Sequence, residues 1–183
     1  MFFKYYSFLW IMKSLFIIAQ EGYQDTEYGT PKKILEEKGI AVITASEKVG
    51  LCHGGLGGNT TAQISLKEVL VSDYDLIVFI GGPGAVGYQH NVEAYRIAQE
   101  AVQQQKLLGA ICIAPTILAY AGVLKGKKAT VWNQDGQQNK LLQQQGAVYT
   151  GETVTVDGKI VTANGPKAAE EFGKKLLLVL NRN

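Results

Sequence analysis

The residue best suited to covalent chemistry is Cys112, which directly follows the apolar run 107–111 and precedes Pro115 by three positions. This order predicts a buried strand that turns at once into a helix, because proline is tolerated in the first helical turn, where its missing N–H is not needed. A nucleophile elbow has the same layout. A helix N-terminus lowers the pKa of a nearby thiol, so we expect Cys112 to be a reactive thiolate; a buried structural cysteine is the alternative.

Two glycines, Gly81 and Gly82, follow the apolar run 76–80, which we expect to lie beside the strand of the cysteine. Glycine lets the backbone approach a ligand closely. We therefore expect the N–H groups of Gly82 and Ile113 to form an oxyanion hole. The pattern that starts at Gly82 also matches the G-x-G-x-x-G fingerprint of dinucleotide sites. It follows the third predicted strand instead of the first, so we predict no cofactor.

A third candidate is Glu27, in the segment between the first predicted strand, 15–19, and a helix predicted over 29–38. We expect Glu27 to lie in a loop above the same carboxyl ends of the strands as Cys112. A protonated Glu27 can donate a hydrogen bond to a thiolate or relay a proton, which requires that burial or the neighbouring sulfur charge raises its pKa. The alternative is a surface acid that complements a helix dipole.

The elements that must position these residues alternate along the chain between short apolar runs and amphipathic stretches. The predicted strands are 15–19, 40–44, 76–80, 107–111 and 129–132, with a hairpin of 153–156 and 160–162 around Asp157-Gly158 and a glycine-rich hairpin within 47–61. The predicted helices are 29–38, 65–70, 93–105, one ending near 121, 137–145 and 168–180. This alternation predicts an α/β fold, a flavodoxin-like three-layer α/β/α sandwich around a mainly parallel sheet, whose sites form at the carboxyl ends of the strands.

Composition argues against several classes of protein. The 183 residues are 46% apolar and 19% charged with a net charge of +2, which is typical of a globular domain and not of a nucleic-acid binder. With two cysteines and two histidines we predict no metal site. No apolar run has the length of a membrane span, so we expect a cytoplasmic protein without a membrane partner. We interpret residues 1–11 as an N-terminal extension, with an anchor as the alternative, and 12–183 as one domain.

These segments together resemble the ThiJ/PfpI superfamily, which includes the Parkinson-disease-associated protein deglycase and the archaeal intracellular peptidases. The resemblance covers residues 12–181 and rests on four features: Glu27, the Gly81-Gly82 turn, the segment 110–116 around the cysteine, and Ala163-Asn-Gly-Pro166 before the last helix. It implies a cofactor-free reactive-cysteine protein with a small carbonyl substrate, which assembles as a homo-oligomer.

The chain departs from this family at two informative positions. Peptidase-like members carry histidine directly after the cysteine, where this chain has Ile113, and no histidine follows Cys112 anywhere. A hydrolase assisted by imidazole needs a positioned base, which only a histidine of a neighbouring subunit could then supply. Deglycase-like members often carry histidine where Trp132-Asn133 stands, so we expect these two residues to line the substrate pocket; a core tryptophan is the alternative.

Three functions follow from this interpretation. The first is glyoxalase- or deglycase-like chemistry on small dicarbonyls, with the Cys112 thiolate as nucleophile and Glu27 as proton relay. The second is a redox sensor or stress-protective module that acts through oxidation of Cys112. The third, an intracellular cysteine peptidase, is disfavoured by the missing histidine.

Overall fold

The computed structural model describes residues 12–182. The predicted extension 1–11 lies outside the described residues. Within the described part of the chain, no helix is long and apolar enough to cross a membrane.

The centre of the molecule is a seven-stranded sheet in the order β11-β12-β8-β7-β1-β3-β6. All neighbouring strands are parallel except the hairpin of β11 and β12, which are antiparallel as the Asp157-Gly158 turn predicts. The strands are β1 (Lys13–Ile17), β3 (Ala41–Ser46), β6 (Ile64–Ser65), β7 (Leu76–Phe79), β8 (Leu107–Ile111), β11 (Val154–Asp157) and β12 (Ile160–Ala163).

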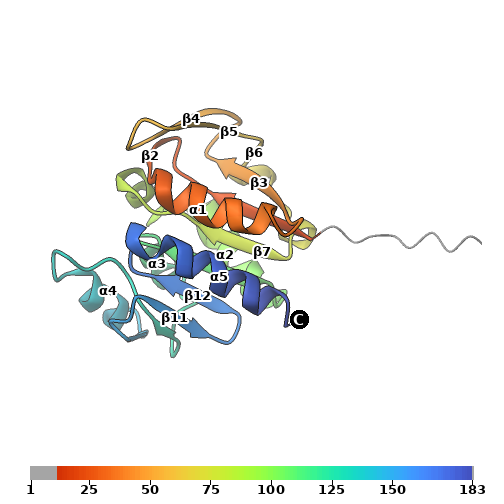
Figure 1. Ribbon diagram of the computed structural model, residues 1–183. Helices are drawn as coiled ribbons and strands as arrows, with labels where there is room; N and C mark the ends of the chain where they lie inside the picture. The colour runs from red at the N-terminus through yellow and green to blue at the C-terminus, as the bar shows by residue number, and fades with distance from the viewer. Residues whose placement is uncertain (1–11, 183) are drawn as a thin grey trace, which may run out of the picture.

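Helices cover both faces of this sheet, which confirms the flavodoxin-like three-layer fold. Figure 1 shows α1 and α5 side by side on the near face, with α2 and α3 behind the sheet and α4 at its lower edge. The helices are α1 (Asp25–Glu36), α2 (Val92–Gln103), α3 (Pro115–Tyr120), α4 (Gln138–Gln144) and α5 (Ala169–Leu180).

Consecutive residues of the central strands belong to opposite layers of the core. Leu15 and Ile17 join one buried apolar cluster, whereas Phe16 and Ile18 join the other. Successive side chains of a strand point to opposite faces of a sheet. A strand covered by helices on both faces must therefore be apolar at every position, which is why these strands read as continuous apolar runs.

Two small sheets flank the central one. A three-stranded sheet in the order β2-β4-β5 contains the hairpin predicted within 47–61, and β9 pairs with β10. These strands are β2 (Glu21–Tyr23), β4 (Gly50–Gly54), β5 (Asn59–Ala62), β9 (Lys128–Ala129) and β10 (Val148–Tyr149). Short 3-10 helices are η1 (Leu66–Glu68), η2 (Val71–Asp73), η3 (Pro83–Tyr88) and η4 (Pro166–Ala168).

Two predicted boundaries are wrong by three residues or more. The first long helix begins at Asp25, four residues before the predicted start, and contains Pro31 in its interior. In the predicted helix Pro31 would lie in the first turn, where its missing N–H costs nothing, whereas in the observed helix it removes a backbone hydrogen bond. The predicted strand 129–132 is also too long, because β9 ends at Ala129 and Trp132 lies in irregular chain.

Candidate active site

Cys112 lies at the carboxyl end of β8 in a turn that leads into α3. Its backbone has φ of +64°, in the left-handed region that a residue with a Cβ rarely adopts. The chain is held on both sides of this turn. The N–H of Cys112 donates to the carbonyl of Ala163 at 2.9 Å, and its carbonyl accepts from the N–H of Trp132 at 2.9 Å. The half-buried side chain thus projects from a fixed, strained backbone.

Glu27 lies in the first turn of α1 and not in a loop, which corrects the prediction. The helix starts early because Gln24 acts as N-cap, its side chain accepting a hydrogen bond from the N–H of Glu27 at 2.9 Å. The Glu27 side chain is completely buried, at 0% exposure. A surface acid at the helix dipole is therefore excluded.

A single glycine brings the acid and the cysteine together. A Cβ on Gly81 would lie 2.5 Å from Cβ of Cys112 and 2.6 Å from Oε2 of Glu27. Cβ atoms do not tolerate contacts this short, so only glycine lets both side chains approach at this position. The structure therefore places Glu27 and Cys112 against the same residue of the turn that follows β7.

Few groups are placed to stabilise a negative charge on the buried carboxyl of Glu27. Among the described residues neither of its oxygens has a hydrogen-bond partner of good geometry, although the Cys112 thiol and the Gly81 N–H approach it. Burial raises the pKa of Glu27 to about 7, from an ordinary value of 4.5, against the smaller opposing effect of those two groups. Glu27 can therefore hold or release a proton near neutral pH.

The expectation that the helix lowers the thiol pKa is wrong. Burial and then the negative charge of Glu27 raise the pKa of Cys112 to about 12, while the N–H groups of Gly82 and Ile113 lower it less strongly. The helix α3 has only six residues and begins three positions after the sulfur. Because the Glu27 charge is one of the causes, protonation of Glu27 removes it and favours the thiolate.

The backbone N–H groups of Gly82 and Ile113, which we predict to be oxyanion donors, lie near the Cys112 thiol. Gly82 adopts φ of +106°, and a Cβ there would lie 2.5 Å from the carbonyl oxygen of Gly22. A glycine is thus required for its N–H to reach this position.

Trp132 and Asn133 line a cavity of about 590 Å³ together with Tyr149, Asn164 and Lys167. Cys112 is not among the residues that line this cavity. The cavity adjoins the cysteine turn through the hydrogen bond from the N–H of Trp132 to the carbonyl of Cys112. Trp132 is half-buried, so it is not a core residue.

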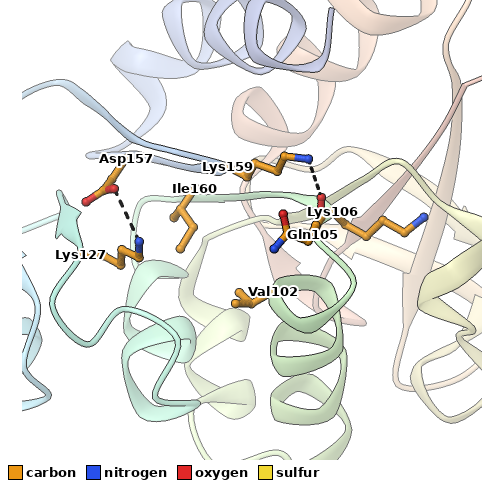
Figure 2. Close-up of a pocket in the computed structure, with 7 residues that line it drawn as sticks. All are labelled: Val102, Gln105, Lys106, Lys127, Asp157, Lys159 and Ile160. Carbon is orange, nitrogen blue, oxygen red and sulfur yellow. Dashed lines mark hydrogen bonds and ion pairs between the residues drawn. The ribbon is translucent and has the colours of Figure 1, made fainter. Parts of the chain in front are cut away.

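A second cavity, of about 220 Å³, lies at the opposite end of β8 (Figure 2). Three lysines line it, and Figure 2 shows the amino groups of Lys106 and Lys159 extending to one side and that of Lys127 lying at the other, beside Asp157. Lys159 donates to the carbonyl of Gln105 at 3.0 Å, and Lys127 lies 3.8 Å from the carboxylate of Asp157. These contacts leave no convergent group for chemistry.

Both histidines contact other residues. The ring of His53 lies 2.8 Å from the carboxylate of Glu21, and the ring of His90 lies against Tyr120 with centroids 4.8 Å apart. Within the described chain, no group of three or more histidine, cysteine, aspartate or glutamate side chains could hold a metal ion.

Sequence reasoning missed Gln24, which ties the Glu27 turn to the glycine turn. The three-residue spacing from Gln24 to Glu27 matches the capping-box spacing of a helix start, which was the available signal. Glutamine is not among the preferred N-cap residues, so the signal was weak.

Comparison with known proteins agrees with the geometry. The family model described as the DJ-1/PfpI family matches residues 12–178. The relative called uncharacterized protein MJ0967, from Methanocaldococcus jannaschii, is 36% identical over 172 residues, covering 93% of this chain and 83% of that protein. Deglycase PfpI of Pyrococcus furiosus is 32% identical over 155 residues, covering 85% of this chain and 91% of its own.

Solved structures agree as well. The crystal structure of a ThiJ/PfpI domain protein from Brachyspira murdochii has a TM-score of 0.89 at 30% identity, covering 93% of this chain and 97% of that chain. The resemblance inferred from the motifs is thereby confirmed: the chain belongs to the DJ-1/PfpI family.

Proposed function

We propose that this protein is a cofactor-independent enzyme of the glyoxalase or deglycase type, in which Cys112 attacks small dicarbonyls and Glu27 moves protons. The observation that carries the proposal is the contact of a buried acid, titrating near neutral pH, with a cysteine on a strained strand-to-helix turn. The deglycase name of the Pyrococcus relative supports the same chemistry.

The first step requires a thiolate. The pKa values of about 7 for Glu27 and about 12 for Cys112 put the single proton of the pair mainly on the sulfur, so the reactive form is the minor one in which Glu27 holds that proton and the sulfur is charged. The thiolate attacks the aldehyde carbon of a dicarbonyl such as methylglyoxal and forms a C–S bond. The carbonyl oxygen becomes an alkoxide, accepts hydrogen bonds from the N–H groups of Gly82 and Ile113, and takes the proton from Glu27.

The second step moves a proton between carbons. The Glu27 carboxylate removes the hydrogen from the former aldehyde carbon and returns a proton to the neighbouring carbon, while the hydroxyl proton of the first carbon passes to the oxygen of the second, which leaves a thioester on Cys112. Water then hydrolyses the thioester and releases lactate and the thiol. One water is consumed and the carbon atoms exchange oxidation levels, so no external oxidant or reductant is needed.

A second candidate function is oxidation of Cys112 to a sulfinate. Two molecules of peroxide would each transfer one oxygen to the sulfur and leave as water. The same two backbone N–H groups and a protonated Glu27 would stabilise the new oxygens, which favours this alternative over a structural role. A peptidase has no such support, because both histidines contact other residues.

One experiment separates these functions. Wild type, Cys112→Ser, Glu27→Gln and the control Cys52→Ser are incubated with methylglyoxal and then with peroxide, and both lactate and intact mass are measured. Cys52 is a matched control because it is the second cysteine and is wholly buried. Lactate formation that depends on Cys112 and Glu27 supports the enzyme. A gain of two oxygens without turnover supports the sensor, and turnover that survives Cys112→Ser contradicts both.

A further inference from the structure

Gln24 connects three parts of the candidate site. Its side-chain Oε1 accepts from the N–H of Glu27 at 2.9 Å, its own N–H donates to the carbonyl of Gly81 at 3.0 Å, and its carbonyl accepts from the N–H of Tyr28 at 3.1 Å. The residue is half-buried. One residue therefore joins the helical turn that carries the acid to the glycine turn that both reactive side chains touch.

Glutamine is an unusual choice for this position. Asparagine, aspartate, serine and threonine are the preferred N-cap residues, because their short side chains reach the N–H groups of the first turn. Asn91, the N-cap of α2, follows that rule and accepts from the N–H groups of Glu93 and Ala94 at 2.9 and 3.0 Å. Helix stability alone would favour the same choice at position 24.

Close packing couples Gln24 to the glycine turn. A Cβ on Gly82 would lie 2.6 Å from the backbone nitrogen of Gln24, so the two backbones are in direct contact. The neighbouring Gly81 touches Oε2 of Glu27 and Cβ of Cys112. A displacement of the first turn of α1 would therefore change the distance between the acid and the sulfur. We propose that Gln24 is the positioning residue that fixes this distance, an inference that rests on the proposed function.

Other charged groups around α1 do not face Glu27. The titratable group that faces its carboxyl is Cys112. The carboxylate of Asp25 accepts from the N–H groups of Leu56 and Gly58 at 2.7 Å each, in the turn of the β4–β5 hairpin. On α5, Glu170 and Lys174 line a surface groove with Asp25, from which Glu27 is absent.

Two substitutions at position 24 are expected to act in opposite directions. Gln24→Ala removes the cap, so the first turn loosens, water reaches the carboxyl, and the pKa of Glu27 falls. Gln24→Glu keeps an acceptor of the same length and adds a negative charge, which raises the pKa of Glu27. For methylglyoxal we expect Gln24→Ala to lower kcat/KM by about tenfold or more, because small misplacements of reacting groups are costly.

The test is the pH dependence of Cys112 alkylation by iodoacetamide, in a Cys52→Ser background that leaves one thiol. The first rise of the rate with pH reports loss of a proton from the Glu27–Cys112 pair. We expect its midpoint to move down by about one pH unit in Gln24→Ala and up in Gln24→Glu. The matched control Asn91→Ala also loses an N-cap and should lower the melting temperature without moving the midpoint.

The outcomes are distinguishable from those of the proposed function. Superimposable profiles for wild type and both Gln24 variants would overturn the positioning role, as would an equal shift in Asn91→Ala. If Gln24→Ala fails to fold, Gln24→Asn decides, because its shorter side chain keeps a neutral acceptor but must move the first turn of α1, so an unchanged midpoint in that variant would overturn the positioning role. Alkylation needs no substrate turnover, so opposite shifts without any lactate formation would support the positioning role and reject the enzyme.

Discussion

The two ends of β8 carry the same unusual backbone conformation for different reasons. Gln105, just before the strand, has φ of +58°, and Cys112, just after it, has φ of +64°. In the described part of the chain they are the two non-glycine residues with positive φ. The surroundings of the two residues differ in burial and in the groups beside them, and these differences distinguish strain at a candidate site from strain that only ends a helix.

At Gln105 the conformation ends a helix. The N–H of Lys106 donates to the carbonyl of Ala101 at 2.8 Å, and that of Gln105 donates to Val102 at 3.1 Å. This pair of bonds is the Schellman motif, which requires a left-handed residue after the helix. The nearby side chains are exposed or bonded to carbonyl and carboxylate groups at the surface, as Figure 2 shows for Lys159. Helix termination accounts for this strain completely.

At Cys112 no helix ends, and the surroundings are buried. The adjacent carboxyl of Glu27 is fully buried, and none of the described residues gives it a hydrogen bond of good geometry. Buried polar groups are normally paired, so this exception requires an explanation. Strain together with a buried, unpaired acid therefore distinguishes the end of β8 that we propose to be reactive, whereas strain alone does not.

The largest effect is expected from glycine at position 112. We expect Cys112→Gly to reduce turnover of methylglyoxal by about a thousandfold or more, because the nucleophile is lost. Relief of the left-handed strain should offset the lost side-chain contacts, leaving the free energy of unfolding within about 1 kcal/mol of wild type. Lactate formation and urea unfolding measure the two effects. Retained turnover would show that the strained turn carries no chemistry.

Glu27→Gln should separate activity from stability. We expect turnover to fall by about a hundredfold or more, because the amide cannot relay protons. The folded protein keeps the Glu27 proton up to about pH 7, whereas an ordinary glutamate loses it near 4.5, so wild-type stability should decline as pH rises between these values. The variant lacks this decline and should be more stable at pH 8, by at most about 3 kcal/mol. Parallel stability curves for both proteins would argue that Glu27 ionises normally.

Gly81→Ala tests the contact that joins the two reactive groups. The new Cβ would lie 2.5 Å from Cβ of Cys112 and 2.6 Å from Oε2 of Glu27, so both side chains must move. We expect a loss of about 1–3 kcal/mol in unfolding free energy and a clear drop in Cys112 alkylation or a shift of its pH midpoint. Gly87→Ala is the control, since nothing lies within 4 Å of its Cβ position. Equal behaviour of the two variants would contradict the proposed geometry.

The smallest effect is expected at the other end of β8. Gln105→Gly should raise the unfolding free energy by about 0.5–1 kcal/mol, because glycine adopts the left-handed conformation without a steric cost. Turnover and the alkylation profile should remain those of wild type. A changed alkylation profile would contradict this expectation and would mean that the two ends of the strand are energetically coupled.

The sequence predicts the frame of the site better than its chemistry. The strand 107–111 and the Asp157-Gly158 hairpin were found at their predicted places because apolar runs and turn residues encode them locally. The start of α1 was missed because it depends on the side chain of Gln24, and glutamine is not among the preferred N-cap residues. The predicted direction of the Cys112 pKa shift was wrong. The shift depends on burial and on Glu27, which is far away in the sequence, and local sequence patterns encode neither.

The two hydrogen bonds that fix the main chain at Cys112 limit how a modification of its sulfur could be recognised. Because Ala163 and Trp132 anchor this residue from either side, adding a substrate fragment or oxygen atoms to the sulfur should leave the course of the backbone unchanged. Any partner that responds to the modified protein would then have to contact the altered sulfur directly, because the modification would not rearrange a loop.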